Sequence, residues 1–229
     1  MNYNDNKEIL RELYTQKGLT ANFEKDSRYL EDAFNKITEI WFANLDQIQK
    51  VKYLMIAEAP LWGNKESYIY NPNTPFTQFF YKSDLESVLN GITINDKADF
   101  IKTCNDIGLL VIDISPFALN TEDTTINYRR KSATNPYGIT KGEYKQLIKE
   151  TLPFFFECKI QAVVPKMSAG IKVFFRYARV KEAFQNIISN TLINNGLTQS
   201  PYDTLEISNQ AGGIDRIKLF QIIHTERGN

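Results

Sequence analysis

The stretch Val51-Lys-Tyr-Leu-Met-Ile-Ala57, followed at once by Glu58-Ala-Pro-Leu-Trp-Gly63, decides the fold. Its first half is a short apolar run, and its second half is a loop that contains Pro and Gly. An apolar run of this length that ends in such a loop is typical of a buried strand in an α/β protein. We therefore expect a strand at 51–57 with a ligand-binding loop at its carboxyl end.

The same pattern recurs further along the chain, at 108–113, 160–164 and 218–224. Residues 204–208 and 216–220 also flank a Gln-Ala-Gly-Gly-Ile turn, which predicts a hairpin. Continuous apolar runs suit strands buried on both faces, and right-handed crossovers place helices on each side of the sheet. The predicted fold class is therefore α/β, a three-layer α/β/α sandwich around a mainly parallel four-stranded sheet.

The first 48 residues predict two amphipathic helices, at 5–17 and 24–48. In the second, the apolar side chains recur at helical spacing: Leu30, Phe34, Ile37, Ile40 and Trp41. These helices are expected to pack on the sheet. Residues 1–229 are then expected to form a single domain.

The composition narrows the classes of function. Lys plus Arg and Asp plus Glu both number 27, so any contact with nucleic acid needs a local basic patch. Only two cysteines and one histidine are present, which excludes a four-cysteine cluster and a histidine-rich metal site. No run approaches the roughly 18 apolar residues of a membrane span. We expect a cytoplasmic monomer with no metal, no cofactor and no membrane contact.

The order of the motifs resembles that of the uracil-DNA glycosylase superfamily, especially the branch with a Gly-Glu-Ala-Pro-Gly first motif. The corresponding residues here are Ala57-Glu-Ala-Pro-Leu61 at the end of the first strand, Pro75-Phe76 where that branch has a Pro-Phe pair that opens a helix, and Leu109–Asp113 on the second strand. The third strand and its helix correspond to 162–171, and the last strand ends at His224. Asp113 stands where the family has an Asn that reads the base edge.

The resemblance implies a role for each of these side chains. Glu58 would assist the attack of water on the sugar, and His224 would steady the departing base. Phe76 would stack on a flipped base. An ionised Asp113 only accepts hydrogen bonds, so it suits a base with an amino group better than uracil, unless the carboxyl is buried and protonated. A capping role for Asp113 in its own turn is an equal alternative.

Other side chains are candidates for contacts around that base. Tyr68 belongs to the same aromatic group, and for any one aromatic residue core packing is the stronger alternative. The remaining candidates for the substrate pocket are Tyr70, Pro60, Trp62 and Ser168. The candidates for contacts with a nucleic-acid backbone are Arg129, Arg130, Lys131, Lys166 and Arg227, with Lys172, Arg176 and Arg179 after the third strand. Solvated surface charge is the usual alternative for such residues.

Three functions are consistent with these features. The first is a DNA glycosylase that hydrolyses the N-glycosidic bond of a flipped base, with single-stranded DNA or a damaged duplex as partner. The second is a non-catalytic module that keeps the fold and binds nucleic acid or a nucleotide. The third is a hydrolase of free nucleotides or nucleosides, which fits the neutral net charge better than duplex binding does.

Overall fold

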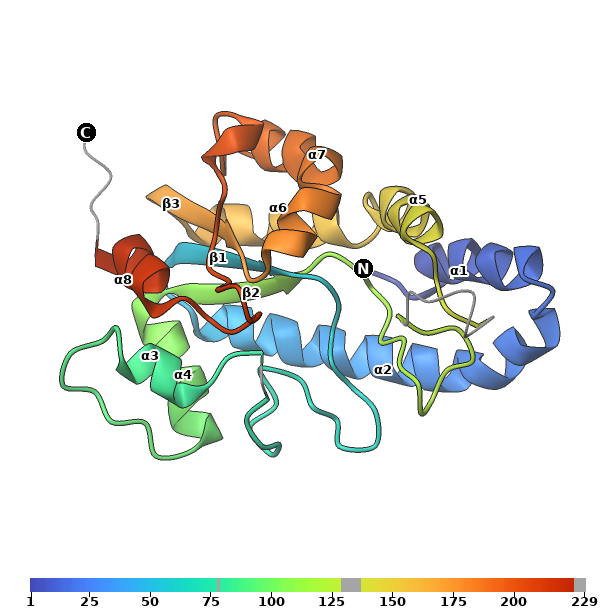
Figure 1. Cartoon of the computed structure of the whole chain (residues 1–229), viewed down its shortest axis with the longest axis horizontal. Coiled ribbons are helices and arrows are strands. Elements are labelled where there is room, and N and C mark those ends of the chain that lie inside the picture. Colours follow the sequence, from blue (N-terminus) through green and yellow to red (C-terminus); the bar gives the residue numbers. More distant parts are fainter. Residues whose placement is uncertain (78, 129–136, 225–229) are drawn as a thin grey trace.

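A central parallel sheet organises the molecule (Figure 1). The structure is a computed structural model, and it describes residues 1–77, 79–128 and 137–224. The strands, in the order β2-β1-β3-β4, are β1 (Val51–Ala57), β2 (Leu109–Asp113), β3 (Met167–Phe175) and β4 (Leu205–Glu206). All three pairings are parallel. β1 and β3 therefore occupy the middle of the sheet.

The first two predicted strands are confirmed at 51–57 and 109–113. The third is wrong, because residues 160–164 belong to the helix α6 (Phe156–Val163) and the 3-10 turn η1 (Val164–Lys166). In α6 the buried positions are 156, 159, 160 and 163, which is helical spacing. The actual strand begins directly after η1.

The fourth predicted strand is also wrong, because residues 218–224 lie in α8 (Arg216–His224). Leu219 and Ile222 are buried three positions apart, which fits a short helix resting on the protein. The predicted hairpin is wrong for the same reason. β4 pairs in parallel with β3, and only one isolated antiparallel bridge, between Ser208 and Ile214, closes the turn.

The N-terminal helices are confirmed as α1 (Asn4–Gln16) and α2 (Thr20–Gln47). Gly18 lies between them with a φ of 71°, a conformation that glycine adopts without strain. Trp41 is fully buried, and its indole Nε1 donates to the carbonyl of Val111 at 2.9 Å. This hydrogen bond joins α2 to β2.

Helices flank the sheet, as expected for a three-layer α/β fold. α6 and α7 (Ala178–Asn194) lie above it in Figure 1, and α2 lies below it with α3 (Lys82–Glu86) and α4 (Lys97–Ile107). α5 (Lys141–Thr151) contacts α1, and a 3-10 turn, η2 (Pro201–Asp203), precedes β4. Within the described ranges, no helix has both the length and the apolar composition needed to cross a membrane.

The loops that leave the strands are joined at the carboxyl edge of the sheet. The amide of Ser115 donates to the carbonyl of Glu58 at 3.0 Å, which connects the loops after β2 and β1. The amide of Arg176 donates to the carbonyl of Ile56 at 2.9 Å, which brings in the segment after β3. This edge, where ligands bind in parallel α/β sheets, therefore has a fixed arrangement of loops.

Candidate functional site

A pocket of about 320 Å³ opens at this carboxyl edge. It is bounded by segments that follow β1, β2 and β3, which is the location expected for a ligand site in a parallel sheet. Its lining combines a carboxylate, an arginine and several flat aromatic side chains. The lining residues are Glu58, Ala59, Pro60, Leu61, Trp62, Phe79, Ala118, Leu119, Asn120, Tyr128, Tyr177 and Arg179.

Glu58 is the acidic group of this pocket. Its side chain is only 13% exposed, and Oε2 forms an ion pair with Nη2 of Arg179 at 2.9 Å. Arg179 is 59% exposed and is the second residue of α7, so it reaches the pocket from the helix that follows β3. Glu58 lies at the end of β1, as predicted, and there it is beside a cation from α7, the helix that follows β3.

Buried hydroxyl groups lie next to Glu58. Tyr128 donates to the carbonyl of Phe117 at 2.6 Å and shares a 2.9 Å hydrogen bond with Ser115. Tyr144 donates to the backbone carbonyl of Glu58 at 3.5 Å. Burial raises the pKa of both tyrosines, and the negative charge of Glu58 contributes to each rise. Both hydroxyls therefore stay protonated and keep the loop after β1 in place.

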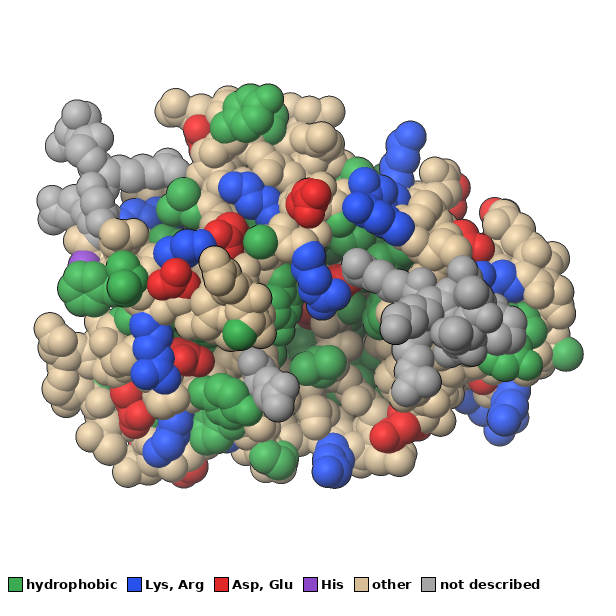
Figure 2. Space-filling model, in the orientation of Figure 1, with side chains coloured by type: hydrophobic (Ala, Val, Ile, Leu, Met, Phe, Trp, Pro, Cys, Tyr) green, Lys and Arg blue, Asp and Glu red, His purple; other side chains and the backbone are tan. Residues whose placement is uncertain are grey.

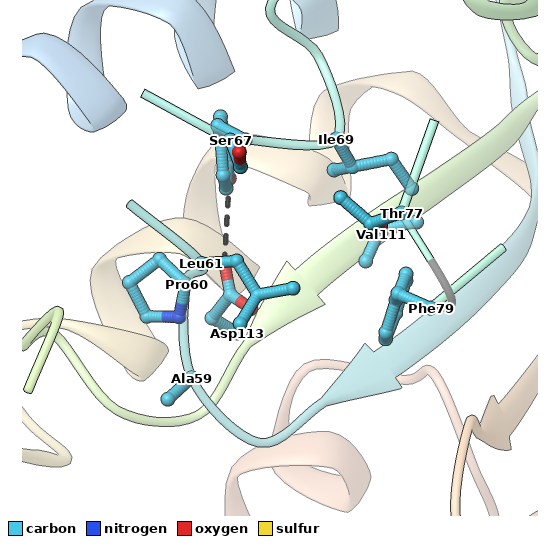
Figure 3. A pocket seen from close by; sticks show the side chains of 10 residues that line it. Ala59, Pro60, Leu61, Ser67, Ile69, Thr77, Phe79, Val111 and Asp113 are labelled. Carbon is cyan, nitrogen blue, oxygen red and sulfur yellow. Dashed lines mark hydrogen bonds between the residues drawn. The ribbon is translucent and has the colours of Figure 1, made fainter. Parts of the chain in front are cut away.

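Asp113 faces a smaller pocket of about 20 Å³, enough for about one water molecule (Figure 3). The two pockets share Pro60 and Phe79 in their linings. Tyr68 donates to Oδ2 of Asp113 at 3.3 Å, shown as the dashed line in Figure 3. Burial raises the pKa of Asp113 to about 6, against the opposing effect of the positive charge of Lys159. The second predicted site residue thus lies beside the first.

Lys159 is a feature of the site that the sequence did not predict. Its amine lies 4.7 Å from the ring centroid of Trp41 and 4.3 Å from that of Phe155, and it has no hydrogen-bond partner among the described residues. Burial lowers its pKa to about 8, while Asp113 opposes that change. The sequence does not single out Lys159, because it predicts a strand at 160–164, whereas Lys159 lies in α6 with its side chain buried.

His224 does not join Glu58. It lies on α8, with Nε2 2.6 Å from the carbonyl of Val88 and its ring 4.3 Å from that of Phe220. Tyr53 donates to the carbonyl of Ile223 at 2.8 Å, which fixes the end of α8 beside the amino half of β1. Glu58 lies five positions further along the chain, roughly 16 Å at the usual rise of a strand. His224, the one histidine of the sequence, therefore lies away from the pocket in which the resemblance places it.

The aromatic candidates divide between the pockets and the core. Trp62 and Pro60 line the larger pocket, and Tyr68 and Pro60 line the smaller one. Tyr70 is fully committed to the core, where its hydroxyl accepts from the amide of Val111. Phe76 packs edge-on against Phe100 at 5.6 Å and lines neither pocket. Phe76 therefore does not line the larger pocket, whose aromatic side chains are Trp62, Phe79, Tyr128 and Tyr177.

Several basic candidates have structural roles. Lys166 lies at the amino end of β3 and donates to the carbonyls of Leu45, Asp46 and Ile48 at 2.8 to 3.0 Å, so it caps α2. Ser168 lies at the same end of β3, away from the pocket. Lys172 donates to the carbonyl of Ile222, and buried Arg176 donates to that of Phe79. Arg129, Arg130, Lys131 and Arg227 lie outside the described residues.

Among the described residues, the face drawn in Figure 2 shows no broad basic region. In Figure 2, Lys and Arg side chains alternate with Asp and Glu over this face. In the part of the chain that the structure describes, no group of three or more His, Cys, Asp or Glu is arranged to hold a metal ion. Comparisons with protein-family models, with curated proteins and with solved structures found no match to the chain. The function is therefore inferred from the residues of the pocket.

Proposed function

We propose that the protein hydrolyses the N-glycosidic bond of a nucleotide unit whose base occupies the carboxyl-edge pocket. The observation that carries this proposal is Glu58, a largely buried carboxylate in a pocket of about 320 Å³ with flat aromatic walls. That volume is at the lower end of the range for small-molecule sites. β1 is a central strand of the sheet, and Glu58 directly follows it.

The chemistry follows from the carboxylate. Glycosidic bonds break through a transition state in which the sugar gains positive charge, and a nearby anion stabilises it. A water molecule held by Glu58 attacks the anomeric carbon, and its proton passes to the carboxylate. The base leaves with the electron pair of the broken bond and then takes up a proton. Sugar and free base are the two products.

The walls of the pocket suit a planar base. Trp62 and Tyr128 contribute aromatic rings to the lining, and stacking on such rings tolerates different bases. Asp113, in the adjoining smaller pocket, is an acceptor when ionised, so it favours a base that carries an amino group. Asn120 does not read the base, because its amide already bonds Tyr29 and the amides of Glu122 and Asp123.

The test is release of free base, measured by chromatography. Substrates should include nucleosides, nucleoside monophosphates, and single-stranded and duplex oligonucleotides with normal and deaminated bases. Glu58→Gln should reduce release at least about a hundredfold, the usual effect of losing a general base. Glu122→Gln, which changes an exposed acid in the loop after β2, is the matched control and should release base like the native protein.

A non-catalytic binding module is the second candidate, and a specific observation favours it. His224 lies away from Glu58, and Glu58 is paired with Arg179, so no histidine assists the leaving base. Under this alternative the same ligands bind in the pocket without release of base. Equilibrium binding measured beside the release assay separates the two candidates.

A further inference from the structure

We infer that the pocket selects a ligand with a phosphate group, and that Arg179 binds this phosphate after leaving Glu58. The inference rests on the proposed function and deepens it by naming the part of the substrate that is recognised. It is motivated by the position of Arg179, which lines the same pocket as Glu58 and forms an ion pair with it at 2.9 Å. Of the residues that the structure describes, Glu58 and Arg179 are the two charged side chains in the lining of this pocket.

The two partners of this ion pair differ in exposure. Glu58 is 13% exposed, whereas Arg179 is 59% exposed, so the guanidinium borders solvent while the carboxylate lies within the pocket. An ion pair with one exposed partner contributes little to stability and can be exchanged for another anion. Nη2 of Arg179 contacts Glu58, and a guanidinium carries five N–H donors in a planar fork that matches phosphate.

The surroundings of Arg179 favour an anion. Its guanidinium lies 5.2 Å from the ring centroid of Tyr177, and that of Arg176 lies 4.2 Å from the same ring. Arg179 is also in the first turn of α7, a helix of 17 residues, where the helix dipole adds positive potential. A phosphate beside Arg179 therefore meets positive charge on the outer side of the pocket.

The exchange has a consequence for the carboxylate. While Arg179 contacts Oε2 of Glu58, it occupies a position from which a water molecule could otherwise donate a hydrogen bond to that oxygen. A phosphate carries more charge than a carboxylate and offers bidentate hydrogen bonds, so it competes for the arginine. A neutral nucleoside has no group that can do so. Binding of phosphate therefore ends the ion pair between Arg179 and Glu58 while the substrate occupies the pocket.

The first test compares ligands by calorimetry on the full chain. A nucleoside 5′-monophosphate should bind about tenfold or more tightly than the matching nucleoside, the effect expected from a charge-assisted hydrogen bond. Arg179→Gln should abolish this difference, and Arg28→Gln, which changes an exposed arginine of α2 that lines neither pocket, should leave it intact. Thermal melting checks that the variants stay folded.

The second test asks whether Glu58 and Arg179 exchange. Glu58→Gln should tighten binding of the monophosphate, because it releases the arginine as well as removing a repulsive charge. The same substitution in an Arg179→Gln background should give a clearly smaller gain, since only the repulsion is lost. Equal gains in both backgrounds, equal affinity for monophosphate and nucleoside, or no binding of either would overturn the inference. Phosphate-dependent binding through Arg179 without release of base would instead contradict the proposed function alone.

Discussion

Asp113 shows how burial sets the state of a single group. It is 3% exposed at the last position of β2, with the hydroxyl of Tyr68 at 3.3 Å and the charge of Lys159 nearby. The sequence allowed either an ionised carboxylate or a buried, protonated one. The shifted pKa of about 6 lies between these alternatives, so Asp113 is mainly an acceptor at neutral pH and mainly a donor in mild acid.

The raised pKa predicts how stability depends on pH. Because the folded protein holds the proton of Asp113 more tightly than the unfolded chain, the contribution of Asp113 to the free energy of unfolding should fall as pH rises from about 4 to about 6. The loss is on the order of 2 kcal/mol. Lys159 stays protonated over this range, since its pKa is about 8. Urea unfolding at pH 4 to 7 should show a flatter profile for Asp113→Asn. An unchanged profile contradicts the prediction.

The same side chain predicts a substrate preference. Uracil presents a carbonyl to the position where an ionised Asp113 offers only acceptors, so release of uracil by the native protein should be weak. Asp113→Asn restores a donor with little change in volume and should improve uracil binding about tenfold to a hundredfold. A single-turnover assay on uracil-containing DNA, with Glu58→Ala as control, measures this. Robust release of uracil by the native protein that Glu58→Ala abolishes would show the interpretation of Asp113 to be wrong.

At the scale of elements, the two junctions that could be predicted are those where an apolar run meets a Pro-containing loop. Residues 51–57 and 109–113 are buried strands with no helical spacing to compete. Residues 160–164 are equally apolar but too short to separate a strand from a helix, and packing on α7 decides for a helix. The run Ile171-Lys-Val-Phe-Phe175 was the available signal for β3, since β-branched and aromatic residues favour strands.

Lys166 stabilises the end of α2 and does not line the candidate site. The amine of Lys166 donates hydrogen bonds to three carbonyls at the end of α2. Lys166→Met removes these bonds and should lower the free energy of unfolding by roughly 1–2 kcal/mol. Nucleotide affinity should stay within about twofold, because Lys166 lines neither pocket. Urea unfolding and calorimetry measure the two quantities. A loss of affinity without a loss of stability would restore the phosphate-binding role expected from the sequence.

Across the whole molecule, the candidate site residues lie in two places: Glu58, Asp113 and Arg179 near the carboxyl edge of the sheet, and His224 on α8. Glu58 and Asp113 lie at this edge, because parallel strands end together there, and Arg179 reaches the same edge from α7. That part of the site could be predicted from the strand ends. The place of His224 could not, since it depended on a fourth strand that is α8. The pairing of Glu58 with Arg179 also needed the correct position of β3.

A substitution of His224 tests whether this residue is outside the functional site. Its ring nitrogen contacts the carbonyl of Val88, and its ring packs on Phe220, so His224→Ala should lower the free energy of unfolding by about 1 kcal/mol. Base release should remain within about twofold of the native rate, since the histidine lies away from the pocket. Rates of release and urea unfolding curves measure both effects. A hundredfold slower release by a stable variant would return His224 to the site.

A single-turnover reaction in water enriched in oxygen-18 shows whether the protein hydrolyses a glycosidic bond with Glu58 as the base. Native protein should release free base, and the heavy oxygen should appear on the anomeric carbon of the sugar, because the water held by Glu58 forms the new bond. Glu58→Gln should lower the rate at least about a hundredfold, while Glu122→Gln reacts like the native protein. Release of base at the native rate by Glu58→Gln, or no release from any substrate by the native protein, would contradict the account.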